Sequence, residues 1–101
     1  MRHNFDFSTI PATESALRLG ARIRLARKAQ RLTLLDLERV CRIHRTTLGR
    51  LERGDLGVSL GLLLSVLEAL GELADVELLL SQPDKPAHQR GTKAPILEQE
   101  F

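Results

Sequence analysis

The sequence predicts an all-α fold, and three features of its composition support that prediction. Apolar residues make up 43 % of the 101 positions, which suffices for one small core. There is no Trp or Tyr, and the only aromatic residues are Phe5, Phe7 and Phe101, so the core must be aliphatic. Leu, Ala, Arg and Glu are frequent in the middle of the chain, and these residues lose little side-chain freedom in a helix.

The patterns divide the chain into three segments. Residues 1–14 lack a helical period and contain Pro11, so we expect a flexible N-terminal arm there. Residues 15–80 carry the helical patterns and are expected to form one domain. Residues 81–101 are polar, aperiodic and contain three prolines, which predicts a flexible tail.

Four helices are expected inside the domain, followed by one ambiguous segment. The first spans about 15–30, where apolar residues recur at three- and four-residue spacing. The next three span about 34–41, 45–53 and 60–70. Residues 72–80 fit a helix or a strand, and we favour the helix. As a helix this segment would bury Leu73, Val76, Leu79 and Leu80.

The two short helices have the size and spacing of a helix-turn-helix motif. Thr33 and Asp36 form a T-x-x-D capping box at the start of the first of them. His44 stands at the N-cap position of the second, which is expected to bury Leu48 and Leu51. A three-residue turn between two such helices is typical of the motif.

Basic residues are concentrated around this motif. Residues 18–53 contain eleven Lys or Arg and three Asp or Glu, a local charge of +8, whereas the whole chain carries +2. A segregated basic segment favours binding to a polyanion, most often nucleic acid, over a merely solvated helix face. The second helix of such a motif enters the major groove of DNA, where Arg can donate two hydrogen bonds to guanine. Arg45, Thr46 and Arg50 are therefore the candidate base contacts.

The stretch "LGARIRLARKAQRLT…RTTLGRLERGD…VSLGLLLSVLEALG", residues 19–71, resembles the Xre or Cro/C1-type helix-turn-helix family. The phrases "RLERGD" and "VSLGLLLSVLEALG" are most similar to its HipB-like branch of antitoxins. The resemblance implies a domain of four to five helices. It also implies base contacts by Arg45, Thr46 and Arg50, phosphate contacts by Thr33, His44 and Arg53, and a structural ion pair between Arg27 and Glu52.

The HipB-like resemblance further implies a dimeric repressor that binds an inverted-repeat operator in double-stranded DNA, autoregulates its operon and holds a HipA-like kinase toxin. The half-sites would lie about one helical turn, ~34 Å, apart. Surplus apolar residues on the fourth helix and on the following segment also favour a homodimer. The interface is expected to include Leu64, Leu67, Val76 and Leu79. Two alternatives are a stand-alone Xre-type repressor and a toxin-binding module with weakened DNA binding.

Three positions depart from the family pattern. Glu38 replaces a small Ala that lets the two motif helices approach closely, and Leu34 replaces the usual Gln at the start of the first one. Arg42 replaces a Gly in the turn, where a left-handed conformation costs a non-Gly residue about 1 kcal/mol. We therefore expect looser packing between these helices, and the weakened-binding alternative depends on that expectation.

Catalytic, metal-binding and membrane functions are not indicated. Cys41 has no second cysteine to pair with and fits a small core residue. The spacing of His3, His44 and His88 is not that of metal ligands. No serine occurs in a pattern with His and Asp, and no glycine-rich phosphate-binding loop is present. We therefore expect neither a cofactor nor an enzyme. No signal pattern or apolar run of about 20 residues occurs, which predicts a cytoplasmic, nucleoid-associated protein without membrane contact.

Overall fold

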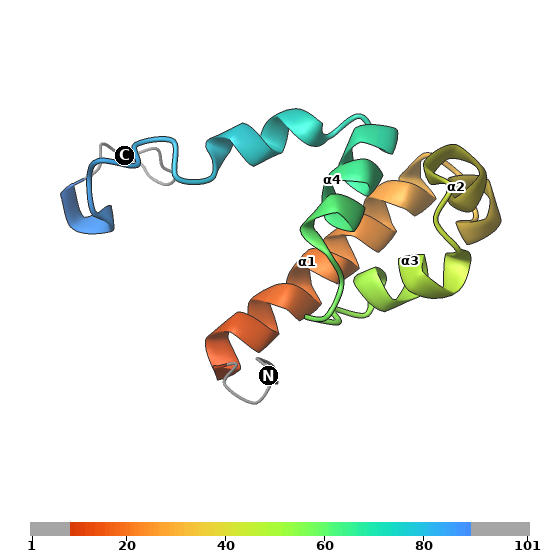
Figure 1. The fold of residues 1–101 in the computed structure, drawn as a ribbon, viewed down its shortest axis with the longest axis horizontal. Coiled ribbons are helices and arrows are strands. Elements are labelled where there is room, and N and C mark those ends of the chain that lie inside the picture. Colours follow the sequence, from red (N-terminus) through yellow and green to blue (C-terminus); the bar gives the residue numbers. More distant parts are fainter. Residues whose placement is uncertain (1–8, 90–101) are drawn as a thin grey trace.

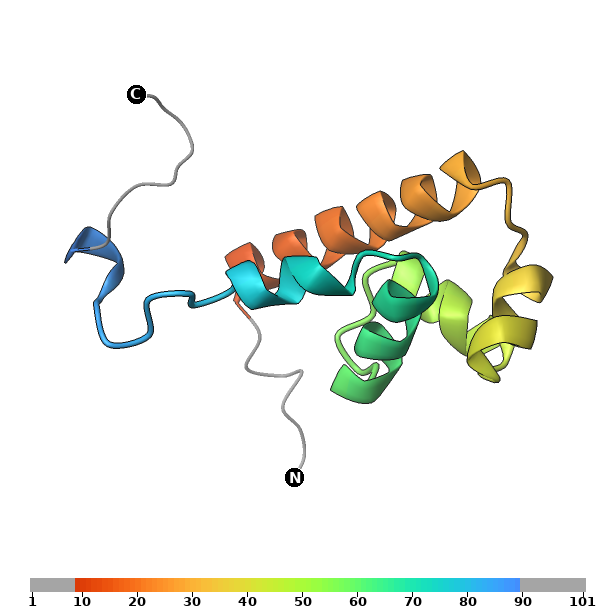
Figure 2. The same cartoon turned by 90° about the horizontal axis from the view of Figure 1, so that it is seen from above.

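The computed structural model describes residues 9–89, and within this range it contains helices and turns but no strand. The long helix α1 (Ile10–Ala29) runs diagonally behind α4 in Figure 1 and lies along one side of the other helices in Figure 2. Three shorter helices, α2 (Leu34–Cys41), α3 (Arg45–Glu52) and α4 (Leu60–Ala69), gather around its C-terminal half (Figure 2). The predicted all-α fold is confirmed.

Side-chain caps fix where these helices begin. The Thr33 hydroxyl accepts a hydrogen bond from the Asp36 backbone N–H at 3.0 Å, and the Asp36 carboxylate accepts one from the Thr33 N–H at 2.8 Å. This is the predicted capping box. The Ser59 hydroxyl caps α4 by accepting from the Leu62 N–H at 3.0 Å. Because these caps involve near neighbours in the sequence, the starts of α2 and α4 could be predicted from the sequence alone.

Helix α1 begins at Ile10, five residues before its expected start. The expected arm, residues 1–14, is therefore wrong in its last five residues, which are helical. These residues lack an apolar period, but a threonine cap precedes them and Pro11 stands in the first turn. A proline is tolerated there because its missing N–H has no intrahelical partner to lose. The rest of the expected arm, residues 1–8, lies outside the described residues.

The core is aliphatic and joins all four helices. Leu37 of α2 and Leu48 of α3 are each 1 % exposed, so these two helices pack closely. Glu38, which was expected to loosen this packing, is half-buried and does not expose either leucine, because its carboxylate accepts a hydrogen bond from the Arg45 N–H at the start of α3. The other buried apolar residues are Ile23, Leu51, Leu62, Val66 and Leu70.

Helices α1 and α3 meet at Gly20. A Cβ atom at this position would lie 2.6 Å from the backbone oxygen of Leu51 and 2.5 Å from that of Glu52. Both atoms belong to the last turn of α3, which cannot move aside as a flexible side chain could. The absence of a side chain at Gly20 therefore lets α3 lie directly against α1.

Beyond α4 the chain leads away from the four-helix body (Figures 1 and 2). Residues Leu73–Leu78 form the 3-10 helix η2, which has no buried residue, and Ala87–Gln89 form the short helix η3. The segment is thus helical rather than extended. The predicted burial is wrong for Leu73, Leu79 and Leu80, which are exposed, and Val76 is only half-buried. Residues 90–101 of the expected tail lie outside the described residues.

Candidate nucleic-acid interface

The turn between α2 and α3 adopts the left-handed conformation that its sequence makes costly. Arg42 has φ 61° and ψ 36°, and its N–H donates to the Glu38 carbonyl oxygen at 2.7 Å. This hydrogen bond closes the C-terminus of α2, and Arg42 takes the left-handed cap position that is often occupied by glycine. The Arg42 side chain is exposed, and its left-handed conformation carries a backbone cost of about 1 kcal/mol. The motif therefore forms without its usual glycine.

His44 caps the N-terminus of α3, as predicted. Its Nδ1 atom accepts a hydrogen bond from the Thr46 N–H at 3.0 Å. Because Nδ1 is the acceptor, the neutral ring must carry its proton on Nε2. That N–H is the type of donor that binds a phosphate oxygen, so capping and phosphate contact are compatible in one side chain.

The three candidate base contacts lie on α3, and two of them are held by carboxylates. Arg45 opens the helix with its side chain 52 % exposed, and its Nη1 lies 3.3 Å from Glu38 Oε1. Thr46 is exposed beside it. Arg50 is half-buried, and its Nε donates to Asp55 Oδ2 at 2.7 Å. The structure thus brings Arg45 and Thr46 together on the first turn, with Arg50 farther along the helix.

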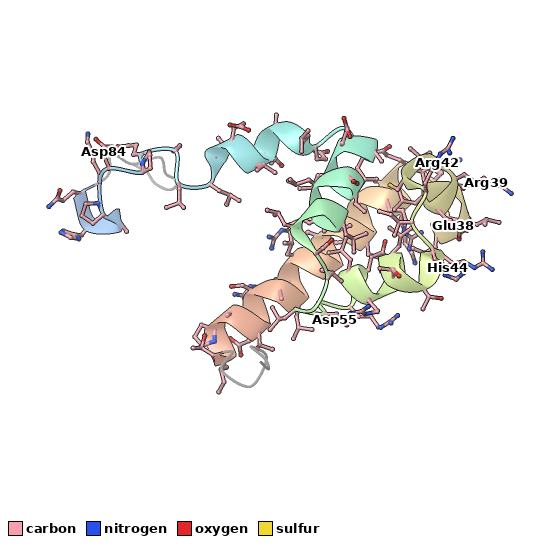
Figure 3. The ribbon with its side chains drawn as sticks, in the orientation of Figure 1. Glu38, Arg39, Arg42, His44, Asp55 and Asp84 are labelled. Atoms are coloured by element: carbon pink, nitrogen blue, oxygen red, sulfur yellow. The ribbon has the colours of Figure 1, made fainter. Side chains whose placement is uncertain are left out.

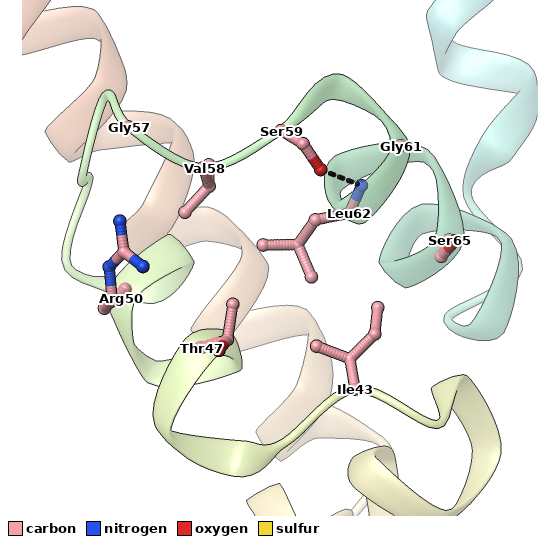
Figure 4. Close-up of a pocket in the computed structure, with 9 residues that line it drawn as sticks. All are labelled: Ile43, Thr47, Arg50, Gly57, Val58, Ser59, Gly61, Leu62 and Ser65. Carbon is pink, nitrogen blue, oxygen red and sulfur yellow. Dashed lines mark hydrogen bonds between the residues drawn. The ribbon is translucent and has the colours of Figure 1, made fainter.

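Asp55 fixes Arg50 against the loop between α3 and α4. Its second oxygen accepts from the Gly57 N–H at 2.7 Å, so one carboxylate holds both the loop and the guanidinium. In Figure 4 the Arg50 side chain extends toward Gly57 along a pocket that Thr47 also lines. The hydrogen bond from Arg50, and next the one from the Gly57 N–H, lower the pKa of Asp55. The hydrogen bond with Asp55 and the charge of its carboxylate raise the pKa of Arg50. Both groups are therefore charged at neutral pH.

The candidate phosphate contacts stand at opposite ends of α3. His44 is its N-cap and Arg53 its C-cap, and at 1.5 Å per residue they lie about 13 Å apart along the helix. This spacing is close to the ~12 Å width of the major groove. Arg53 lines a surface pocket with Arg24 and Leu34, the residue that follows Thr33. His44 and Arg53 therefore mark the two ends of α3, and Thr33 caps the neighbouring helix α2.

The surface around the α2–α3 turn is rich in basic side chains. Figure 3 shows Arg39, Arg42 and His44 gathered at this end of the molecule, with Glu38 between them. Asp84 lies at the far end of the segment that follows α4. Three of the eleven basic residues of positions 18–53, Arg39, Arg42 and Arg45, thus lie on or beside the turn that leads into α3.

A comparison with family models matches residues 23–76 to HTH_3, a helix-turn-helix family. The match covers the last seven residues of α1 and all of α2, α3 and α4. The chain belongs to this Xre/Cro-C1-type helix-turn-helix family. Membership indicates a sequence-specific DNA-binding regulator. No significant match was found among curated proteins or among solved structures.

In this helix-turn-helix protein, Arg27 and Glu52 hold α1 against α3. Arg27 Nε and Nη2 donate to the two Glu52 carboxylate oxygens at 2.7 and 3.0 Å, and Nη1 donates to the Leu32 carbonyl at 2.7 Å. The two side chains are only 8 % and 6 % exposed. The Glu52 hydrogen bond raises the pKa of Arg27 against the opposing effect of burial. This pair is too enclosed to contact DNA and acts on the fold.

The residues expected at a dimer interface lie on α4 and on the segment after it. Leu64, Leu67 and Val76 are half-buried within the single chain, and Leu79 is exposed. Leu67 lines a groove between α1 and α4 that also contains Leu19. All four leave apolar surface uncovered, on a part of the molecule separate from the exposed first turn of α3.

Two functional partners, Glu38 and Asp55, were missed by the sequence prediction. Asp55 follows the end of α3 in a turn, and a short acidic residue next to glycines could have indicated its contact with the Gly57 N–H. Glu38 and Arg45 are seven residues apart, but they lie on different helices, so their spacing does not place them on one helix face. Their contact depends on how α2 and α3 pack, which the local pattern does not encode.

The structure adds little to the case for a reactive cysteine, a metal site or a membrane segment among the described residues. Cys41 is half-buried with its Sγ 3.8 Å from the Ser65 carbonyl oxygen, and burial raises the pKa of its thiol. Among residues 9–89, no group of three His, Cys, Asp or Glu side chains could hold a metal ion. No helix in that same range has the length and apolarity needed to cross a membrane.

Proposed function

We propose that the protein is a dimeric transcriptional repressor that binds double-stranded DNA at an inverted-repeat operator and acts in the cytoplasm, at the nucleoid. The observation that carries this proposal is the two-sided character of α3. Arg45 and Thr46 are exposed on its first turn, whereas Leu48 and Leu51 are buried in the core. Such a helix can enter a major groove without loss of its packing. Bound near a promoter, the protein would block polymerase.

The uncovered apolar residues beyond the motif support the proposed homodimer. Leu78, Leu79 and Leu80 are 73 %, 72 % and 67 % exposed, and a second copy of the chain is the partner that an inverted repeat requires. Two copies would present two α3 helices to successive major grooves, about 34 Å apart. Sedimentation that shows only a species of one chain mass, 11.3 kDa, at tens of micromolar would argue against the dimer.

We further propose that the repressor is the antitoxin of a HipBA-like operon and helps to neutralise a HipA-like kinase toxin. The support is the likeness of "RLERGD" and "VSLGLLLSVLEALG" to the HipB-like branch, together with an exposed apolar segment away from α3. Co-purification with a kinase encoded next to this chain would favour the antitoxin over a stand-alone repressor. A toxin-binding module with weakened DNA binding is the less favoured alternative, because α2 and α3 remain closely packed.

The decisive experiment compares specific and non-specific binding of Arg45→Ala and Arg50→Ala at one fixed salt concentration. The specific site would be selected from random duplexes with the unmodified protein. A lost bidentate contact with guanine costs about 1–3 kcal/mol on the selected site and far less on random DNA. Arg18→Ala, which removes an exposed cation on α1, is the matched control and should weaken both alike. Equal losses on both DNAs, for both α3 variants, would contradict base reading by these arginines.

A further inference from the structure

Glu38 makes a contact that the small residue usual at its position could not make. Its Oε1 atom accepts a hydrogen bond from the Arg45 backbone N–H at 3.1 Å and another from Arg45 Nη1 at 3.3 Å. The two side chains are 28 % and 52 % exposed, so the pair lies at the surface next to the start of α3. One carboxylate therefore holds both the backbone and the guanidinium of the residue that opens this helix.

This arrangement leaves Arg45 able to contact a base. A guanidinium carries five N–H donors, and the Glu38 contact uses one on Nη1. A bidentate contact with guanine needs only two donors, which Nε and Nη2 can supply. The carboxylate also satisfies a backbone N–H that the first turn of a helix leaves without a partner, and its negative charge is favourable at that terminus.

We propose that Glu38 is a positioning residue for Arg45, and that it increases discrimination between sequences while it decreases affinity for DNA in general. The inference rests on the proposed base-reading role of Arg45. A guanidinium already held by Glu38 loses less freedom when it meets a guanine, which favours the specific complex. The carboxylate also offsets the Arg45 charge and repels phosphates, which disfavours complexes that depend on charge alone.

Glu38 tests this idea more cleanly than Asp55, the carboxylate that holds Arg50. Asp55 also binds the Gly57 N–H, so its removal would alter the loop between α3 and α4. In Glu38→Gln the side-chain amide oxygen can still accept from the Arg45 backbone N–H, and only the ionic contact is lost. Asp84→Asn is the control for net charge, since Asp84 lies at the far end of the segment after α4 (Figure 3).

The experiment measures the affinities of each variant for the selected site and for random duplex over a range of salt concentrations. For Glu38→Gln we expect tighter binding to random duplex, with a salt slope steeper by about one unit. We expect the ratio of specific to non-specific affinity to fall about tenfold, within the range of about 5- to 150-fold set by one bidentate base contact. Asp84→Asn should leave the ratio unchanged. A merely destabilised fold would weaken binding to both DNAs instead.

Two further variants separate position from charge. Glu38→Asp keeps the charge but shortens the side chain, so the ratio should fall without the gain in affinity for random duplex. In an Arg45→Ala background, Glu38→Gln should leave the ratio unchanged, because coupled residues give non-additive effects. The inference is overturned if Glu38→Gln leaves the ratio unchanged, or changes it equally with and without Arg45, as a direct contact of Glu38 with cytosine would. An unmodified protein that does not discriminate between sequences would instead refute the proposed function, on which the inference depends.

Discussion

Removal of the Glu52 carboxylate should destabilise the domain more than any surface charge change. Glu52→Ala removes two of the hydrogen bonds of the Arg27 guanidinium and leaves the one to the Leu32 carbonyl oxygen. Both side chains of the ion pair are less than a tenth exposed, so water cannot readily replace the lost carboxylate. Breaking such a buried pair costs about 3–5 kcal/mol. This is a large fraction of the roughly 5–15 kcal/mol that stabilises a domain of this size.

The loss is large enough to be measured in two ways. Urea unfolding followed by circular dichroism should give the difference in unfolding free energy directly. In a thermal scan, each 1 kcal/mol lowers the Tm of a domain of 60–100 residues by about 4–8 °C, so Glu52→Ala should lower it by at least about 12 °C. The m-value should stay the same, because the variant still buries the same aliphatic core.

Two controls distinguish burial from mere pairing. Arg39→Ala breaks the exposed contact between Arg39 and Asp36, whose charged atoms lie 4.0 Å apart, and should give no measurable change. The double variant Arg27→Met with Glu52→Leu replaces the buried pair by apolar side chains and should recover most of the stability. The reasoning is refuted if Glu52→Ala loses less than about 1 kcal/mol, or if the double variant is no more stable than the single one.

Four further predictions follow from single residues. Gly20→Ala should destabilise the domain by about 1–3 kcal/mol in urea unfolding, despite the better helix propensity of Ala, because its Cβ would meet the backbone of α3. Arg53→Ala should weaken binding to all DNA alike and reduce the salt slope by about one unit, whereas a changed base preference would contradict its phosphate role. Hydrogen bonds with Thr33, first with its backbone N–H and next with its side chain, lower the pKa of Asp36 in the folded protein. The stability that Asp36 contributes is therefore complete above its unfolded pKa of about 3.9 and is lost as the pH falls below that value. Asp36→Asn should reduce the loss of unfolding free energy at acidic pH, measured by urea unfolding at several pH values. Burial raises the pKa of Cys41, which should react with a disulfide reagent at pH 8 more slowly in the folded protein than in urea.

Elements defined by local signals could be predicted closely from the sequence. The bounds of α2 match the expected 34–41, and α3 ends one residue before the expected position. Both helices begin at polar caps whose partners lie two or three residues away, so the sequence contains the whole interaction. The start of α1 was missed because apolar spacing, rather than its threonine cap, was used to locate it.

Features that depend on packing between elements could not be predicted in the same way. An apolar period tells which residues of η2 share a face, but it does not tell whether another part of the chain covers that face. Gly20 gives a comparable example, because a glycine inside a helical pattern indicates a close approach without naming its partner. The contact of Glu38 with Arg45 requires both the left-handed turn at Arg42 and the close packing of α2 on α3.

These packing contacts change how the charge of the sequence should be understood. The eleven basic residues of positions 18–53 suggest a surface that attracts DNA without regard to sequence. In the folded chain Arg27 is buried in an ion pair, and Arg45 and Arg50 each face a carboxylate from a neighbouring element. The cations free to attract phosphates are therefore fewer than the count suggests, and the candidate base contacts are not among them. Such pairing lowers affinity where only phosphates are offered, and it leaves guanidinium N–H donors for a guanine edge where one is present.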